Sequence, residues 1–242
     1  MLQMKTGKEQ SAYRKPGDGS GPSQVMVYTE YAEFEAAADA LAEKLAVPFC
    51  SDPEQAQSFA QSDLLLHLTR EGLCLEGAGL RLLPDFSSMR PRILKGNLQK
   101  EFLAKVSRIK SPDGEKQQLY AIDATAGLGE DYFLLAACGY QVCMYERDPV
   151  ISALLEDCLH RAAKDPQLAL IASRMQIVQG DSIQALHALA DRQATQDEST
   201  AIPDLIYLDP MFPQRRKSGL IGKKPHYSLE GKAIRYDCFT FA

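Results

Sequence analysis

The stretch DATAGLGED, residues 123–131, decides the fold of this 242-residue chain. An apolar run typical of a buried strand precedes it at 119–123, and a helical pattern follows at 131–138. Gly127 and Gly129 allow a tight turn and leave no Cβ in the way of a ligand. A strand, a glycine turn and a helix in this order are typical of nucleotide-binding parallel sheets.

Working outward from this turn, short apolar strands alternate with helical segments. We predict further strands at 141–145, 175–178 and 205–208, with helices at 150–163 and 182–190. Repeated strand–helix units indicate an α/β fold with a doubly wound, Rossmann-like parallel sheet.

The chain is expected to divide into three parts. Residues 1–22 are rich in Gly, Ser, Pro, Lys and Gln, so we expect a disordered tail. Residues 23–85 carry an amphipathic helix (31–45) and a hairpin, which predict a small N-terminal α+β domain. Residues 86–242 then hold the larger α/β domain, entered through a helix from 97 to 109.

The composition is that of a soluble globular protein, with 45% hydrophobic and 24% charged residues. No apolar run approaches the roughly 18 residues of a membrane span, and the polar N-terminus lacks a secretory pattern. The six cysteines form no CxxC pair and the histidines share no metal-ligand spacing. We therefore expect a cytoplasmic protein with reduced thiols, no membrane partner and no metal, in which His67 is packed or hydrogen-bonded.

A carboxylate follows the second predicted strand. Glu146 lies 23 residues after Asp123, the place of an acid that accepts hydrogen bonds from ribose hydroxyls. The third glycine of the GxGxxG fingerprint is replaced by Tyr132, which disfavours a pyrophosphate cofactor and leaves room for S-adenosylmethionine. A nucleotide-dependent oxidoreductase remains the alternative at this point.

Asp181 and Ser182 follow the third strand, and two interpretations of them stay open. They can hydrogen-bond an adenine amine, or they can simply cap the helix that begins there.

The fourth strand ends in Asp209-Pro210-Met211-Phe212-Pro213, which is similar to the (D/N)-P-P-(Y/F) motif of amino-group methyltransferases. An exocyclic amine is a poor nucleophile because its lone pair is delocalised into the ring. The Asp209 carboxylate and the Pro210 carbonyl can accept its N–H bonds, and Phe212 can stack on a flipped base. The alternative is an Asp-Pro turn that only ends a strand, with Phe212 buried.

Two longer runs, DATAGLGEDYFLLAACGYQVCMYERDPV (123–150) and IYLDPMFPQRRKSGLIGKK (206–224), closely resemble the RsmJ family. The similarity covers most of 86–242. It implies S-adenosylmethionine as cofactor and methylation of the N2 amine of a guanine in 16S rRNA, with the rRNA or the small ribosomal subunit as partner. The candidate cofactor-binding residues are Asp123, Gly127, Gly129, Glu130, Asp131, Glu146, Arg147, Asp181, Ser182 and Asp209; the candidate catalytic residues are Asp209, Pro210 and Phe212.

Basic residues follow the fourth strand and are candidate contacts to RNA phosphates. They are Arg215, Arg216, Lys217, Lys223 and Lys224. A solvated surface loop is the alternative for this segment, and the basic stretch 90–110 is a second candidate. DNA adenine, protein glutamine, or a non-catalytic role in binding RNA during assembly are the alternatives to rRNA methylation.

Only 30 residues follow Phe212, too few for the rest of a seven-stranded sheet. A helix and a strand are therefore expected to be missing near 222–226. A truncation, a missing segment or a natural deletion would each explain this shortfall.

Overall fold

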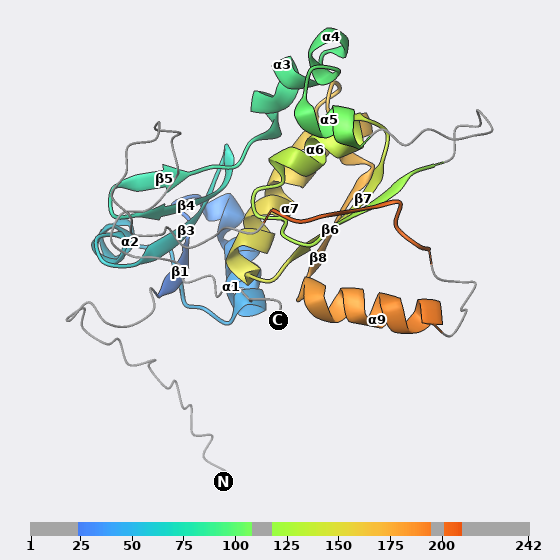
Figure 1. The fold of residues 1–242 in the computed structure, drawn as a ribbon. Coiled ribbons are helices and arrows are strands. Elements are labelled where there is room, and N and C mark those ends of the chain that lie inside the picture. The colour runs from blue at the N-terminus through green and yellow to red at the C-terminus, as the bar shows by residue number, and fades with distance from the viewer. Residues whose placement is uncertain (1–23, 108–117, 195–200, 210–242) are drawn as a thin grey trace, which may run out of the picture.

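The computed structural model of the chain describes residues 24–107, 118–194 and 201–209. These residues form two β-sheets with helices packed around them (Figure 1). None of the helices in these ranges combines the length and the apolar character that a membrane crossing requires.

The N-terminal sheet has five strands in the order β2-β1-β3-β4-β5. Its strands are β1 (Val25–Tyr28), β2 (Phe49–Cys50), β3 (Leu64–Thr69), β4 (Gly72–Gly77) and β5 (Leu80–Leu82). Strand β1 runs parallel to β2 and β3, whereas β3, β4 and β5 are antiparallel. The predicted hairpin is confirmed as β3 and β4.

Helices cover both faces of this sheet because its central strands are apolar throughout, and successive side chains of a strand point to opposite faces. Leu66 faces α1 (Glu35–Leu45) and α7 (Pro149–Lys164), whereas its neighbour Leu65 packs on α2 (Pro53–Ala60). The amphipathic helix predicted at 31–45 is present as α1, preceded by a single 3-10 turn, η1 (Ala32–Phe34).

The second sheet is parallel throughout, with the order β8-β7-β6-β9. Its strands are β6 (Tyr120–Asp123), β7 (Gln141–Glu146), β8 (Met175–Gln179) and β9 (Leu205–Tyr207). Its helices are α6 (Glu130–Ala137), α7 (Pro149–Lys164), α8 (Ala169–Ala172) and α9 (Ser182–Ala194). The α/β prediction is therefore confirmed for the described residues, with element boundaries within a few residues of those expected.

The segment between the sheets differs from the prediction of one helix from 97 to 109. It contains η2 (Phe86–Met89), α3 (Arg90–Ile93), α4 (Lys95–Leu98) and α5 (Phe102–Val106). Glu101 has an extended backbone that separates α4 from α5, and both its carboxylate oxygens accept hydrogen bonds from Arg92 at 2.9 Å. The single helix was wrong for residues 97–107, because the extended backbone of Glu101 interrupts the helical run, and residues 108 and 109 lie outside the described ranges.

Helix α7 lies between the two sheets (Figure 1). Ile151 and Leu154 pack against the N-terminal sheet, whereas Leu155 and Cys158 belong to the core of the parallel sheet. The Asp157 carboxylate also accepts a hydrogen bond from the Leu73 amide of β4 at 3.0 Å. One helix therefore joins the cores of both sheets.

Candidate functional site

The glycine turn between β6 and α6 packs tightly against the core at one glycine and is open to solvent space at the other. Gly127 and Gly129 have φ angles of 52° and 79°, which favour glycine. A Cβ at Gly129 would lie 2.8 Å from Leu155 and 3.1 Å from Phe86, so the turn is pressed onto the core there. A Cβ at Gly127 would approach nothing closer than a backbone oxygen at 3.9 Å. The turn is thus fixed at Gly129 and open to a ligand at Gly127.

Glu146, at the end of β7, holds the turn in place. One of its carboxylate oxygens accepts a hydrogen bond from the Gly127 amide at 3.0 Å, and the other from the Asp148 amide at 2.7 Å. Its side chain is largely buried, and this burial raises the pKa of the Glu146 carboxyl. Each oxygen can accept a second hydrogen bond, so the group that shapes the turn can also receive a hydroxyl.

Asp123, at the end of β6, is fully buried beneath the same turn. Its Oδ1 accepts a hydrogen bond from the Thr125 amide at 2.7 Å, whereas its Oδ2 is buried without a partner. Burial raises the pKa of Asp123 to about 8. A buried carboxylate oxygen with a free lone pair is costly, and a cationic or hydrogen-bond-donating ligand would relieve it.

The end of β9 closes the site from the other side. In the sheet register Tyr207 lies opposite Asp123, and the Asp209 amide donates a hydrogen bond to the Thr125 hydroxyl at 2.9 Å. The Tyr207 hydroxyl donates to the Asp131 carboxylate at 2.8 Å. Asp209 is therefore placed beside the glycine turn, at the same edge of the sheet as Asp123 and Glu146.

The other predicted cofactor residues lie at the margin. Asp181 caps α9, because its carboxylate accepts a hydrogen bond from the Ile183 amide at 2.9 Å, and Ser182 is the first residue of that helix. Asp181 therefore caps α9, and its contact with the cofactor stays a prediction. Glu130 is exposed and lies 4.0 Å from the Arg92 guanidinium, and Arg147 is exposed beside Glu146.

Several predictions fall outside the described residues. They concern the catalytic candidates Pro210 and Phe212, the RNA-binding candidates Arg215, Arg216, Lys217, Lys223 and Lys224, the tail at 1–22 and the expected gap near 222–226.

Three residues that support the site were not predicted: Thr125, Tyr132 and Tyr207. The Tyr132 hydroxyl donates to the Thr125 carbonyl at 2.9 Å, and the rings of Tyr132 and Tyr207 pack edge to face at 5.6 Å. A signal existed for Tyr207, because alternate residues of a strand share a face and Tyr207 stands two residues before Asp209. Nothing in the sequence identifies the bond of Tyr132 to the turn.

Comparisons with known proteins agree with this geometry. Residues 51–225 match the model of a family described as "Putative SAM-dependent methyltransferase". The chain is 38% identical over 162 residues to ribosomal RNA small subunit methyltransferase J of Acinetobacter baumannii (strain SDF), covering 67% of this chain and 53% of that protein. It is 47% identical over 104 residues to the protein of the same name from Aeromonas salmonicida, covering 43% of this chain and 38% of that protein. The chain spans about half the length, or less, of these relatives.

A solved structure shares the fold. A SAM-dependent methyltransferase from Neisseria gonorrhoeae superposes with a TM-score of 0.55 at 23% identity, covering 78% of this chain and 70% of that one. The predicted Rossmann-like methyltransferase sheet is therefore confirmed.

Proposed function

The chain belongs to the family of SAM-dependent methyltransferases, and from this premise we propose that it transfers a methyl group from S-adenosylmethionine to the N2 amine of a guanine in 16S rRNA. The resemblance to the RsmJ family is confirmed by the relatives named methyltransferase J. One observation carries the proposal for this chain: the carboxylates Asp123 and Glu146 and the backbone of Asp209 meet around a glycine turn that is open at Gly127.

The residues around the turn fit a cationic cofactor with ribose hydroxyls. Glu146 would accept hydrogen bonds from the ribose, and Gly127 would let the backbone approach the ligand. Asp131 supplies negative charge beside the turn, which favours a cation over a pyrophosphate, and the unpartnered Oδ2 of Asp123 offers a further hydrogen-bonding group. When bound, S-adenosylmethionine supplies an activated methyl group.

Asp209 would act on the amine that receives the methyl group. Its backbone position is set by the β6–β9 pairing and by the bond of its amide to Thr125, which places it beside the glycine turn. By accepting N–H bonds from the amine, together with the Pro210 carbonyl, it would orient the nitrogen lone pair toward the methyl carbon. Phe212 would stack on the guanine. Catalysis would then rest on positioning.

The basic residues after Asp209 would position the rRNA. Arg215, Arg216 and Lys217 follow within eight residues of the proposed catalytic carboxylate, and Lys223 and Lys224 follow them. Lysine and arginine contacts to phosphates fix orientation without reading sequence. We therefore propose the small ribosomal subunit or its 16S rRNA as the partner, in the bacterial cytoplasm.

Transfer of tritiated methyl groups to naked rRNA, assembled small subunits, DNA and protein, measured in parallel, tests the proposal. We expect label in the guanine N2 position of rRNA, and Asp209→Ala to lower kcat by about 100-fold or more, because the side-chain acceptor for the amine is removed. Asp204→Ala is the matched control, because Asp204 lies at the opposite end of the same strand and is expected to leave kcat unchanged.

Other outcomes identify the alternatives. Label in DNA adenine or protein glutamine would show that the chain is a methyltransferase with a substrate other than rRNA. Tight rRNA binding with no transfer to any acceptor would instead support a non-catalytic assembly factor.

A further inference from the structure

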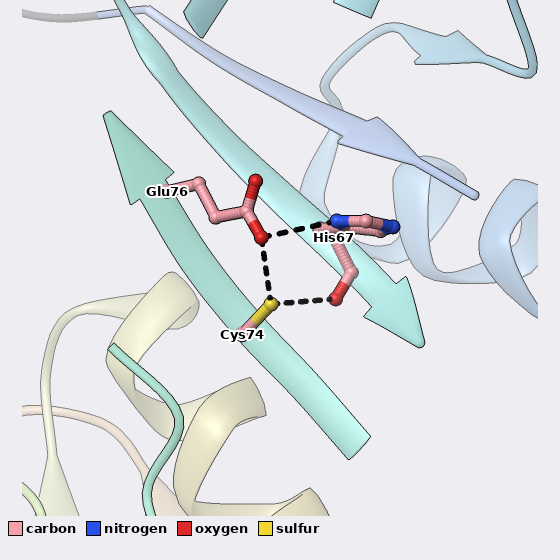
Figure 2. A group of neighbouring side chains, drawn as sticks. All are labelled: His67, Cys74 and Glu76. Carbon is pink, nitrogen blue, oxygen red and sulfur yellow. Dashed lines mark hydrogen bonds and ion pairs between the residues drawn. The ribbon is translucent and has the colours of Figure 1, made fainter. Parts of the chain in front are cut away.

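A cluster of three potential metal ligands lies in the N-terminal sheet, away from the glycine turn. His67 of β3 and Cys74 of β4 are register partners, and Glu76 follows two residues later on the same face of β4. One ligand atom from each residue lies within 4.8 Å of the other two. Figure 2 shows the Glu76 carboxylate placed between the His67 ring and the Cys74 sulfur.

The separations are close to those of a tetrahedral zinc site. Glu76 Oε1 lies 3.1 Å from His67 Nδ1 and 3.3 Å from Cys74 Sγ. Zinc bonds of about 2.0–2.3 Å place neighbouring tetrahedral ligands about 3.3–3.6 Å apart. To bind a cation, each of these two distances would have to lengthen by a few tenths of an ångström. The distance between His67 Nδ1 and Cys74 Sγ would have to shorten by more.

A fourth residue completes the arrangement behind the histidine. His67 Nε2 is bonded to the Glu30 carboxylate at 2.5 Å, so the ring presents Nδ1 to the other two ligands. A carboxylate on the far nitrogen of a metal-binding histidine fixes the ring and strengthens it as a ligand. The Tyr28 ring, 4.7 Å from that of His67, packs against its side.

From this geometry we propose that His67, Cys74 and Glu76 bind a divalent, thiol-preferring cation, Zn²⁺, with Glu30 as the positioning residue. A thiolate, an imidazole and a carboxylate form a ligand set that zinc accepts. The site would join β3 to β4 and stabilise the N-terminal sheet. It does not depend on the proposed methyl transfer.

Arg81 of β5 is the cation that such a metal would displace. Its guanidinium lies 3.3 Å from the Glu76 carboxylate. The Arg81 side chain is 46% exposed and also pairs with Glu71 at 3.0 Å, so it has a partner to which it can turn. Cys74 is fully buried, and metal binding would also displace its thiol proton, because the ligand is the thiolate.

Cobalt and zinc titrations of the metal-free chain test the site without any measurement of activity. We expect the near-ultraviolet thiolate-to-cobalt band at one equivalent of Co²⁺, its loss on adding Zn²⁺, and a rise of Tm with Zn²⁺. The band should be absent in Cys74→Ser. It should persist in Cys50→Ser, a matched control that removes another buried thiol of the same sheet.

Two further variants keep the test decisive if Cys74→Ser folds poorly. Glu30→Gln should weaken zinc binding by about 10–100-fold. Arg81→Gln should tighten it, because the competing guanidinium is removed. No band in the wild-type chain, a band that survives Cys74→Ser, or equal or weaker zinc binding by Arg81→Gln would overturn the proposal.

Discussion

At the scale of single residues, the two glycines of the turn have different tasks. Gly129 is packed against Leu155 and Phe86, whereas Gly127 faces open space and donates its amide to Glu146. Both have positive φ, so both substitutions carry backbone strain. Comparing substitutions at the two glycines therefore separates the effect of core packing on stability from the effect of ligand access on cofactor binding.

Gly129→Ala is expected to lower the free energy of unfolding by about 2–4 kcal/mol, because the new Cβ meets Leu155 at 2.8 Å. Gly127→Ala is expected to lower it by only about 1 kcal/mol while weakening S-adenosylmethionine binding by at least about tenfold. Urea denaturation and calorimetric titration measure the two effects. Equal stability losses, or unchanged cofactor affinity in Gly127→Ala, would contradict this division.

The buried carboxyl of Asp123 makes stability depend on pH. Because its pKa is raised to about 8 in the folded chain, the folded state keeps a proton that the unfolded state loses above the ordinary value. The free energy of unfolding contributed by this group therefore falls as the pH rises from about 4 to about 8.

Asp123→Asn should remove this slope, since the amide does not titrate. We expect the stability of the wild-type chain relative to Asp123→Asn to fall by about 1–3 kcal/mol between pH 5 and pH 9, values that span the shift. Denaturation at several pH values measures the difference, in which the other groups cancel. A constant difference would show that Asp123 is ionised throughout.

At the scale of elements, the helices and strands that follow from a local pattern of residues could be predicted from the sequence. The strand–turn–helix of residues 119–138 was found because apolar periodicity and two glycines are local signals. It placed Asp123, Glu146 and Asp209 together because parallel strands end at one edge. The helix at 97–109 was wrong for residues 97–107, because the extended backbone of Glu101 is a feature that periodicity does not encode.

The N-terminal cluster was not predicted for a related reason. His67, Cys74 and Glu76 have no metal-ligand spacing along the chain, and only the register of the β3–β4 hairpin brings them together. Similarly, the unpartnered Oδ2 of Asp123 is a consequence of its burial in the fold, which the local sequence does not encode.

The N-terminal cap of α7 contributes both to the stability of the chain and to the proposed cofactor site. The Asp148 carboxylate accepts hydrogen bonds from the Val150 and Ile151 amides at 2.8 and 3.1 Å, while its own amide donates to Glu146. Asp148→Ala should lower the free energy of unfolding by about 1 kcal/mol and weaken cofactor binding several-fold, because the chain entering α7 loses its fixed position.

Asp52→Ala is the matched control for this effect. Asp52 caps α2 in the same manner, accepting from the Glu54 amide at 2.9 Å, but it lies in the N-terminal sheet region. It should destabilise the chain without changing cofactor affinity in calorimetry. An equal loss of affinity in both variants would trace the effect of Asp148 to general stability.

At the scale of the whole molecule, the boundary proposed at residue 85 separates the two sheets, but the core of the N-terminal sheet includes residues of α7. Helix α7 packs Leu154 into the N-terminal core and Leu155 into that of the parallel sheet. The Lys44–Glu156 pair at 2.8 Å and the Leu73–Asp157 bond also cross between the two parts. We therefore propose that residues 23–85 and the parallel sheet are distinct in topology but unfold together.

Leu154→Ala tests this coupling, because Leu154 is fully buried and belongs to the core of the N-terminal sheet. The substitution should lower the free energy of unfolding by about 2–5 kcal/mol. If α7 couples the sheets, native-state hydrogen exchange should show the amides of β3 and β7 losing protection by the same free energy. If β3 loses protection while β7 keeps it, the N-terminal sheet is an independent domain, and α7 serves it only as a docking surface.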